Sequence, residues 1–398
     1  MRLPARWAPP AIASAPLPPR PGWTEALLAV LADPDVASKE ALVRQYDHEV
    51  KGMSIEKPFT GLERDAPSDG GVLKPLYDSW RGLTVTHGIC PRLSSRDARA
   101  MALEAVDEAF RAHIALGGNP EGAVALDNFC WPDPVESSAN PDGAYKMAQL
   151  VRACEALKEA CVAYGLPLVS GKDSMKNDAT AGGRRISVAP TLLVTLVGII
   201  DDVRKACSTD FLSVGDLIYI VGATGGLLGA SVLERALEAP GGRAPSSDRL
   251  LGPCPVADPA RHFPIYRAIA RTISGRALRS CHDLSDGGLA VAVAESCLGG
   301  RLGAELRLDA IPRRVDSAEA LSTYPDAAAL LFAEDSGRFL VSIRREDRER
   351  FERSMGGLPL ALVGETTAEP RLRASLDGKA VLDVGLAEIE RAYKTPIA

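Results

Sequence analysis

Positive charge is scarce in this chain of 398 residues, which has 46 Lys and Arg against 52 Asp and Glu and a formal net charge of -6. A nucleic-acid surface needs clustered Lys and Arg to neutralise phosphates, so this balance argues against a nucleic-acid partner. Long hydrophobic runs are also missing, and none approaches the ~20 apolar residues that a membrane helix needs. The first residues alternate Ala and Pro without the continuous apolar stretch of a secretory signal. We therefore expect a cytoplasmic protein with no membrane or nucleic-acid partner.

The eight cysteines lack the spacing of a metal site or a disulfide framework. No two have the CxxC spacing of a zinc site, and several lie in apolar segments that are typical of a core. We expect them to be reduced, as is usual in a cytosolic protein. Hydrophobic residues make up 46% of the chain, which is enough apolar material for sizeable cores without a disulfide or metal.

The order of apolar and turn-forming segments predicts two mixed α/β domains. Residues 1–42 form a proline-rich linker and a short helix, residues 43–205 a first domain and residues 206–398 a second. Short apolar strands alternate with amphipathic helices in both domains. One long helix has apolar positions from Met147 to Cys161 and is expected to end at Gly165.

The first candidate site is Asp127-Asn128, which follows the apolar strand of residues 123–126. Polar residues at the end of a buried strand are often ligand-facing, because strand ends open onto clefts. The same position is also typical of an Asx turn into the prolines that follow.

The second candidate is the run Ser170 to Ser174, directly after the strand of residues 166–169. Gly171 lets backbone N–H groups approach an anion, Lys172 offers a mobile positive charge and Ser174 a hydroxyl, so the run favours phosphate binding. It lacks the spacing of a Walker A loop, and a solvated turn is the alternative.

The third candidate is the run from His282 to Gly288, between a strand and an apolar helix. Its two carboxylates, Asp283 and Asp286, suit a hard cation such as magnesium. The glycine pair at the helix start can present backbone amides to an anion. Asp286 could instead cap the helix, a role that is compatible with the functional one.

Two further carboxylates, Asp69 and Glu108, could join this metal site, although for each residue taken alone the sequence favours a place on the surface. The glycines from Gly222 to Gly229 do not match the GxGxxG dinucleotide spacing. None of the five histidines lies in a metal-ligand pair of the sequence, and no nucleophile–base arrangement is evident.

Taken in series, several motifs resemble the synthetase domains of formylglycinamidine ribonucleotide synthase, and the match runs from about residue 30 to the end. The wider superfamily includes aminoimidazole ribonucleotide synthetase, and its members are ATP-dependent. The motifs are Gln45-Tyr46-Asp47-His48, Leu126-Asp127-Asn128-Phe129-Cys130-Trp131, Pro167-Leu168-Val169-Ser170-Gly171, Ala189-Pro190-Thr191, His282-Asp283-Leu284-Ser285-Asp286-Gly287-Gly288 and Gly337-Arg338-Phe339.

The resemblance implies an aminoimidazole ribonucleotide synthetase-like fold, with a barrel-forming N-terminal domain followed by a C-terminal α/β domain. In that family ATP phosphorylates the formamide oxygen of formylglycinamide ribonucleotide, and ammonia then displaces phosphate to give the amidine. Magnesium neutralises the charge that develops on the phosphates. The implied cofactors are therefore magnesium and ATP, with ADP as an alternative at a second, auxiliary nucleotide site.

The resemblance also implies roles for individual residues. The residues implied to contact ATP are Asp127, Gly171 and Lys172; those implied to contact the substrate are Ser174 and Ser285. The residues implied to bind magnesium at the auxiliary site are Asp69, Glu108 and Asp283. Two positions depart from the family pattern: Lys172 stands where the shorter family form has Asn, and Ala112 where a metal-binding Asn is expected.

No stretch of the chain resembles the family's first synthetase half, which carries the catalytic histidine, and none resembles a glutaminase. The resemblance therefore implies a separate N-terminal synthetase half and a glutaminase subunit as partners, and no catalytic residue is assigned to this chain. Two alternatives remain: a non-catalytic, nucleotide-binding or structural half-subunit, and a homodimeric enzyme that performs another ATP-dependent reaction of the superfamily.

Overall fold

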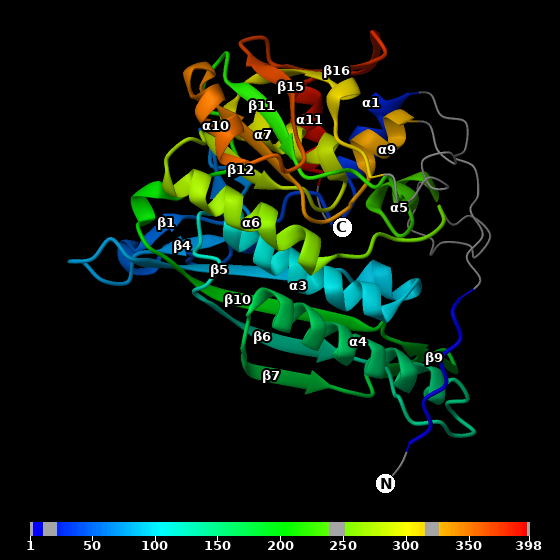
Figure 1. The fold of residues 1–398 in the computed structure, drawn as a ribbon. Helices are drawn as coiled ribbons and strands as arrows, with labels where there is room; N and C mark the ends of the chain where they lie inside the picture. The colour runs from blue at the N-terminus through cyan, green and yellow to red at the C-terminus, as the bar shows by residue number, and fades with distance from the viewer. Residues whose placement is uncertain (1–2, 11–21, 239–250, 315–325, 396–398) are drawn as a thin grey trace.

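Two large β-sheets, one from each half of the sequence, form the framework of the structure (Figure 1). This computed structural model describes residues 3–10, 22–238, 251–314 and 326–395. The first sheet has the strand order β1-β4-β5-β10-β6-β7 and the second the order β12-β14-β11-β15-β13-β16-β17. Helices and strands alternate along both halves, which confirms the predicted α/β (α+β) class.

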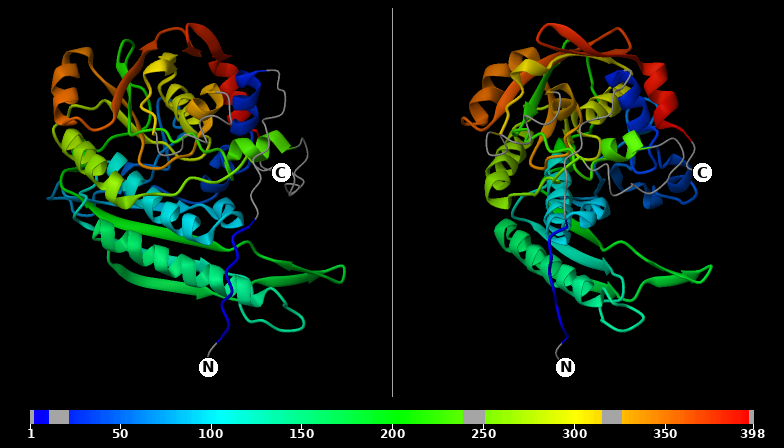
Figure 2. Two further views of the ribbon diagram at one scale, coloured as in Figure 1. Left: turned by 45° about the vertical axis from the view of Figure 1, so that its right-hand side comes forward. Right: turned by 90° about the vertical axis from the view of Figure 1, so that its right-hand side faces the viewer.

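The first sheet is antiparallel except for β6 and β7, which run parallel to each other. Its strands are β1 (Ser54–Glu56), β4 (Gly71–Leu73), β5 (Gly82–Ile89), β6 (Ala123–Cys130), β7 (Leu168–Ser174) and β10 (Thr191–Ile200). Two small hairpins accompany it, β2 (Phe59–Thr60) with β3 (Ala66–Pro67) and β8 (Asp178–Ala181) with β9 (Arg184–Ser187). Helices α3 (Ala98–Ala115) and α4 (Gly143–Tyr164) share a core with one face of this sheet, and Figure 2 shows them beside its strands.

The other face of the first sheet is only partly covered. Residues of β10 alternate between buried and half-buried, and on β5 Val85 is 37% and Ile89 42% exposed. Val85 pairs with Val197 and Ile89 with Leu193, and between them the polar pair His87 and Thr195 lies on the same face. Apolar side chains of the two strands therefore form a patch that this polar pair interrupts. We call this patch the open face; its apolar members are Leu83, Val85, Ile89, Leu193, Val197 and Ile199, and its polar members are His87 and Thr195.

The second sheet is antiparallel apart from the pair β13 and β16. Its strands are β11 (Leu217–Val221), β12 (Ser280–Asp283), β13 (Gly303–Arg307), β14 (Phe339–Ile343), β15 (Leu360–Thr367), β16 (Arg371–Leu376) and β17 (Lys379–Gly385). The helices around it are α1 (Trp23–Leu31), α5 (Val232–Glu238), α6 (Pro259–Ser274), α7 (Gly288–Gly300), α9 (Asp326–Phe332), α10 (Arg348–Ser354) and α11 (Leu386–Tyr393), and a short helix, α2 (Glu40–Val43), follows α1 in the chain.

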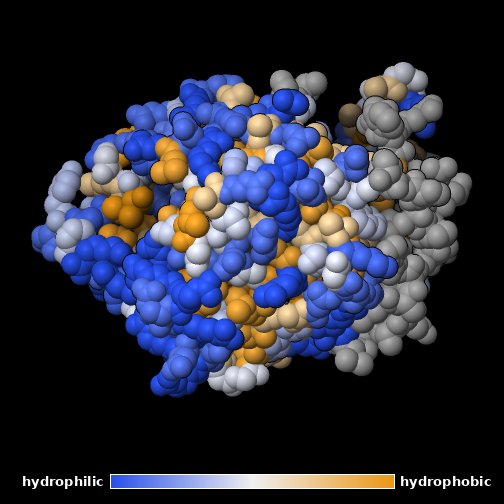
Figure 3. Space-filling model, turned by 90° about the horizontal axis from the view of Figure 1, so that it is seen from above, coloured by the Kyte–Doolittle hydropathy of each residue, from blue (hydrophilic) through white to orange (hydrophobic). Residues whose placement is uncertain are grey.

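The centre of the second sheet is buried on both faces. Every residue of β11, β12 and β14 is buried. Tyr219 of β11 belongs to the core that includes α6 and α3, whereas its neighbour Ile220 belongs to the core that includes α7. Strands covered on both faces are nearly continuous apolar runs, as this segment is. Seen from above, the outer surface is mostly hydrophilic with scattered hydrophobic patches (Figure 3).

The N-terminal segment contacts both halves of the molecule. Helix α1, at residues 23–31, packs against α11 and α5 and contributes to the core of the second sheet. Trp7 stacks on Tyr145 of α4 with ring centroids 5.5 Å apart, and the backbone N–H of Arg6 donates to the carbonyl of Ala144 at 2.9 Å. Most of the predicted proline-rich linker, residues 11–21, lies outside the described residues.

The predicted long helix is α4, and its predicted end is confirmed. Gly165 adopts a left-handed conformation with φ 65°, and its backbone N–H donates to a carbonyl of the last turn. A left-handed residue is disfavoured for side chains with a Cβ, so glycine is suited to this position. Among the helices that the structure describes, none is long and apolar enough to span a bilayer.

Candidate functional site

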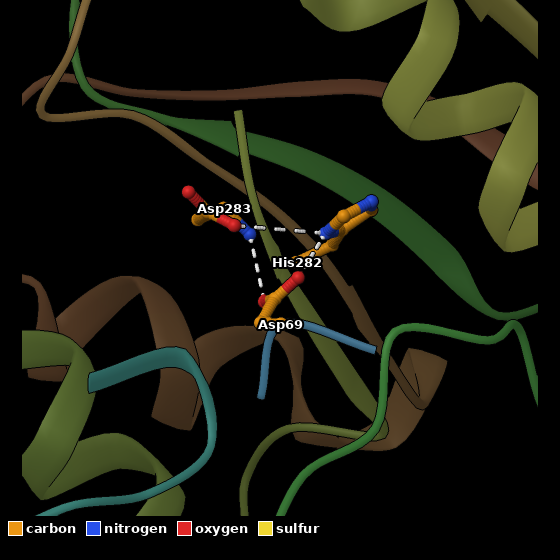
Figure 4. A group of neighbouring side chains, drawn as sticks. All are labelled: Asp69, His282 and Asp283. Carbon is orange, nitrogen blue, oxygen red and sulfur yellow. Dashed lines mark hydrogen bonds and ion pairs between the residues drawn. The ribbon is translucent and has the colours of Figure 1, made fainter. Parts of the chain in front are cut away.

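Three residues from distant parts of the sequence meet where β12 approaches the loop before β4 (Figure 4). Asp69 lies in that loop, and His282 and Asp283 are the last residues of β12. Their potential ligand atoms all lie within 4.8 Å of one another. Asp69 holds the end of β12 through both oxygens, which accept from His282 Nδ1 at 2.6 Å and from the backbone N–H of Asp283 at 3.1 Å.

His282, which the sequence analysis placed in the third candidate run without giving it a role, is an internal cation in this group. Its Nδ1 contacts Asp69, and its Nε2 lies 3.0 Å from Glu295 Oε2 on α7. Burial disfavours the charged ring, but the carboxylates of Asp69 and Glu295 raise the pKa of His282 well above its usual value. Both nitrogens then donate protons, and neither has a lone pair for a metal. His282 therefore orients Asp69 and does not serve as a ligand.

The third predicted metal ligand, Glu108 on α3, lies outside this group of three. Its Oε2 accepts from the backbone N–H of Ile89 at 2.7 Å and from Cys90 Sγ at 3.5 Å. Burial, assisted by the nearby charge of Asp286, raises the pKa of Glu108 to about 8. At neutral pH this carboxyl therefore carries a proton for most of the time, which weakens it as a magnesium ligand.

A buried arginine lies beside the predicted metal ligands. Arg111 Nε donates to Asp283 Oδ2 at 3.1 Å, and Arg111 Nη2 donates to Ser285 Oγ at 3.0 Å. Ser285 Oγ also donates to Asp283 Oδ2 at 2.5 Å. The carboxylate of Asp283 is thus already neutralised by a guanidinium, and a divalent cation beside it would be repelled. Ala112, one residue further along α3, offers no ligand atom. As arranged, these residues do not fit magnesium.

The other side of Arg111 binds Asp107, which the sequence analysis missed. Asp107 is fully buried and accepts from Arg111 Nη1 at 2.5 Å, from Tyr266 at 2.7 Å and from Tyr164; its Oδ1 lies 2.8 Å from His262 Nδ1. Burial opposes ionisation, but the His262 and Arg111 partners hold the pKa of Asp107 well below its usual range. Two of these partners, His262 and Tyr266, come from α6, and no local sequence signal connects them with position 107.

The alternative role predicted for Asp286, as a helix cap, is wrong. The residue before α7 is Gly287, with φ 76° and no side-chain cap. Asp286 instead accepts from Arg92 Nη2 at 2.5 Å and from Arg92 Nη1 at 3.1 Å. Its carboxylate is drawn away from the helix axis by this bidentate pair.

The predicted ATP ligands lie together on β6 and β7, at the far edge of the first sheet (Figure 1). Asp127 pairs with Gly171, and Asn128 with Lys172. The expectation that strand β6 ends at Asp127 is wrong, because the strand continues to Cys130, and this also excludes the Asx turn. A Cβ at Gly171 would lie 2.6 Å from Asp127 Oδ1, so glycine leaves that carboxylate room beside β7.

The run from Ser170 to Ser174 is likewise part of strand β7 and not a loop after it. Its residues are exposed up to Asp173, because β7 is the edge strand. Lys172 Nζ donates to Ser174 Oγ, which places the two side chains on the same face of the strand. Four of the predicted ligand residues therefore lie at one sheet edge, but on two faces: Asp127 and Gly171 are on the face covered by α4, and Lys172 and Ser174 are on the opposite face. The two larger clefts, of about 400 and 590 Å3, contain none of the predicted site residues.

Known proteins resemble this chain over most of its length. The PurL subunit of phosphoribosylformylglycinamidine synthase from Rhodospirillum rubrum is 32% identical over 350 residues, which are 86% of this chain and 41% of that protein. The corresponding subunit from Rhodopseudomonas palustris is 33% identical over 362 residues, 90% of this chain and 43% of that protein. The chain thus spans less than half the length of these two relatives.

A family model and solved structures match as well. The model described as AIR synthase related protein, C-terminal domain, matches residues 213–377. T. maritima PurL complexed with FGAR superposes with a TM-score of 0.67 and 18% identity, covering 93% of this chain and 54% of that one. T. maritima PurL complexed with ATP superposes with a TM-score of 0.64 and 18% identity, covering 95% and 54%. The superpositions show that the fold is shared.

Proposed function

The chain is homologous over most of its length to PurL subunits of phosphoribosylformylglycinamidine synthase, and from this premise we propose that it is the second half of such a synthetase. Together with a separate N-terminal half it converts formylglycinamide ribonucleotide to formylglycinamidine ribonucleotide, with ATP and with ammonia from a glutaminase subunit. The relatives are more than twice as long as the aligned region, which supports a complementary half.

The observation that carries this proposal is the open face. In a stable sheet an apolar face is covered, and the central strands β11, β12 and β14 of the second sheet are covered on both faces. The open face has Val85 at 37% and Ile89 at 42% exposure, although these strands are internal to the sheet. A sheet of the partner half, packed against the open face, would bury these side chains and bring its own residues to the β6–β7 edge.

We place the nucleotide at that edge. Asp127 and Gly171 are paired across β6 and β7, and Lys172 and Ser174 lie on one face of β7. Lys172 supplies a positive charge for phosphate oxygens, and Ser174 supplies a hydroxyl for the substrate. The site is open on the side where β7 has no neighbouring strand, so the partner half would close it. Magnesium would arrive with ATP and be held by the phosphates on the face of Lys172, whereas Asp127, on the α4 face of the same edge, would contact another part of the nucleotide.

The proposal is tested by reconstitution. The chain is mixed with a separately expressed N-terminal half of the R. rubrum subunit, and phosphate release from ATP is measured with formylglycinamide ribonucleotide and ammonium. We expect turnover only when both halves are present and a 1:1 complex in gel filtration. Turnover by the chain alone, or failure of the halves to associate, would contradict the proposal.

Two substituted pairs sharpen the test. Val85→Asp on the open face should abolish association, whereas Val162→Asp on the exposed side of α4, where the side chain is 73% exposed, should leave it intact. Asp127→Asn should reduce turnover by at least tenfold without affecting association, whereas Asp202→Asn, in an exposed pair with Arg204, should not change it. Equal effects of the two valine substitutions would exclude the open face as the interface.

A second candidate function is a non-catalytic structural half. The observation in its favour is that Arg111 binds Asp283, one of the predicted magnesium ligands, and Ser285, one of the predicted substrate ligands. The two candidates differ in the reconstitution assay, because a structural half would associate with the partner but Asp127→Asn would then leave the turnover of the complex unchanged.

A further inference from the structure

The cavity beside Arg111 is too small for a nucleotide. It lies between α3, the start of α7 and the turn at residues 91–95, and its volume is about 30 Å3. Sites for small molecules usually have volumes of about 300–1,000 Å3, whereas one water in the liquid takes about 30 Å3. Arg92, Arg111, Ser285 and Glu334 are among the residues that line it.

Two guanidinium groups neutralise the acidic residues of this cavity. Arg111 is bound to Asp283 on one side and to Asp107 on the other. Arg92 forms ion pairs with Asp286 at 2.5 Å, with Asp35 at 2.5 Å and with Glu334 at 3.3 Å. These contacts join α3 and the neighbouring turn to β12, α7 and the segment after α1. The cations that bind Asp283 and Asp286 are therefore side chains of the chain itself, and Asp69 is bound by His282.

An internal carboxylate also takes the place of a phosphate. Backbone amides at a helix start bind anions, and here the N–H of Gly287 donates to Glu334 Oε1 at 2.8 Å. The N–H of Val232, at the start of α5, donates to the same oxygen at 2.8 Å. Glu334 thus bridges the starts of two helices, and the amides that could hold a phosphate are already bonded.

The glycine-rich segment from Gly222 to Gly229 also binds an internal carboxylate, that of Asp335, the residue after Glu334. Asp335 is fully buried, and its Oδ2 accepts from the backbone N–H groups of Gly225 at 2.9 Å and Gly226 at 3.0 Å. Arg314 Nη2 donates to the other oxygen of Asp335 at 2.8 Å. Two consecutive acidic residues therefore fill two separate amide sites that a phosphate could otherwise use.

We infer that side chains of the chain itself occupy the predicted auxiliary nucleotide site. Arg92 and Arg111 lie where cations would bind, and Glu334 lies where a phosphate would bind. The resulting salt bridges form a clamp between the two halves of the chain. This clamp takes neither magnesium nor ADP. The inference concerns a different part of the molecule from the β6–β7 edge and does not depend on the proposed function.

The first test uses the whole chain. Mn2+ is titrated in and followed by electron paramagnetic resonance, and magnesium-ADP is titrated by calorimetry, with the unsubstituted chain and with Asp283→Asn. We expect the two proteins to have the same Mn2+ occupancy and ADP affinities within twofold of each other. A single Mn2+ or ADP site that is lost in Asp283→Asn would overturn the inference. Nucleotide binding at the β6–β7 edge would be lost in Asp127→Asn and not in Asp283→Asn. The two variants therefore distinguish failure of this inference from failure of the proposed function.

The second test removes the internal cation. Arg111→Met keeps much of the side-chain volume but frees the carboxylates of Asp283 and Asp107, and we expect Mn2+ affinity to rise at least tenfold. The matched control is Arg99→Met, which removes an arginine of the same helix that forms an exposed pair with Glu159. No gain of Mn2+ binding in a folded Arg111→Met protein would contradict the inference. If Arg111→Met does not fold, the Mn2+ and ADP titrations of the unsubstituted chain and of Asp283→Asn still test the inference.

Discussion

The two large sheets of this chain differ in how their faces are covered. The second sheet has α6 on one side and α7 on the other, and three of its seven strands, β11, β12 and β14, are buried throughout. Its other four strands have exposed or half-buried residues. The first sheet has α3 and α4 on one side, and its other side is the open face. A sheet covered on both faces is complete by itself, whereas one with an apolar, half-exposed face has the form of an interface. This difference supports our proposal that the first half of the chain carries the surface for association with a partner.

The largest effect is expected where the two halves are joined. Arg111→Ala would leave Asp107 and Asp283 as buried carboxylates without their guanidinium, and we expect the free energy of unfolding to fall by about 3–5 kcal/mol. Arg204→Ala removes an exposed arginine that pairs with Asp202, and should change it by less than about 0.5 kcal/mol. Urea denaturation followed by circular dichroism measures both. Equal losses would show that the buried network does not join the halves.

A pair of leucines on β10 compares the two faces of the first sheet directly. Leu196 is fully buried against the helices, and Leu196→Ala should cost about 2–5 kcal/mol because it leaves a cavity. Leu193 is half-buried on the open face, and Leu193→Ala should cost no more than about 1 kcal/mol in the chain alone. Adding the partner half should increase the difference that Leu193→Ala makes. A large loss in the isolated chain would show that this face is already covered.

Acid should weaken the first half through one buried histidine. His113 is fully buried, contacts Thr84 Oγ1 through Nδ1 at 2.6 Å and Asn119 O through Nε2 at 3.0 Å, and burial lowers its pKa to about 4. The unfolded chain, with an ordinary value near 6.5, binds the proton first, so up to about 3 kcal/mol is lost as pH falls from 6.5 to 4. His113→Gln should remove this part of the pH dependence in acid-unfolding curves.

His282 gives the second half the opposite dependence on pH. Its pKa is raised, because Asp69 and Glu295 favour the charged ring against the effect of burial. Its contribution is therefore complete below the unfolded value near 6.5 and is lost as pH rises through the folded value. The His113→Gln curve should thus still show the loss on the alkaline side, and its absence there would contradict the charged state of His282.

The smallest effect on the free energy of unfolding is expected from a Val→Thr substitution made once in each sheet. Val341 of β14 is fully buried, and Val341→Thr places a hydroxyl in the core at a cost of about 1–3 kcal/mol. Val85→Thr on the open face should change the free energy of unfolding by less than about 0.5 kcal/mol, because its hydroxyl remains hydrated. Thermal denaturation of the two variants measures the contrast, and similar losses would remove the distinction between the sheets.

Local patterns in the sequence determined the fold class, the alternation of strands and helices and the end of α4 at Gly165. They did so because burial periodicity and left-handed glycines are properties of short segments. The ends of the strands were harder to predict from the sequence. Strand β6 continues through Asp127 and Asn128, and the edge strand β7 through the run to Ser174. Backbone pairing between neighbouring strands holds these polar residues in the sheet without any apolar pattern.

The site was decided by tertiary structure. Position 69 was proposed as a metal ligand by resemblance, but its contact with His282, 213 residues away, follows from the packing of a loop against β12. The contact of Arg111 with Asp283 spans 172 residues, and no periodicity reports which acid a buried arginine will meet. Sequence alone therefore determined which residue types could bind a cation, whereas the fold determined that the cation bound there is an arginine of the same chain, because ion pairing depends on distance in space and not along the chain.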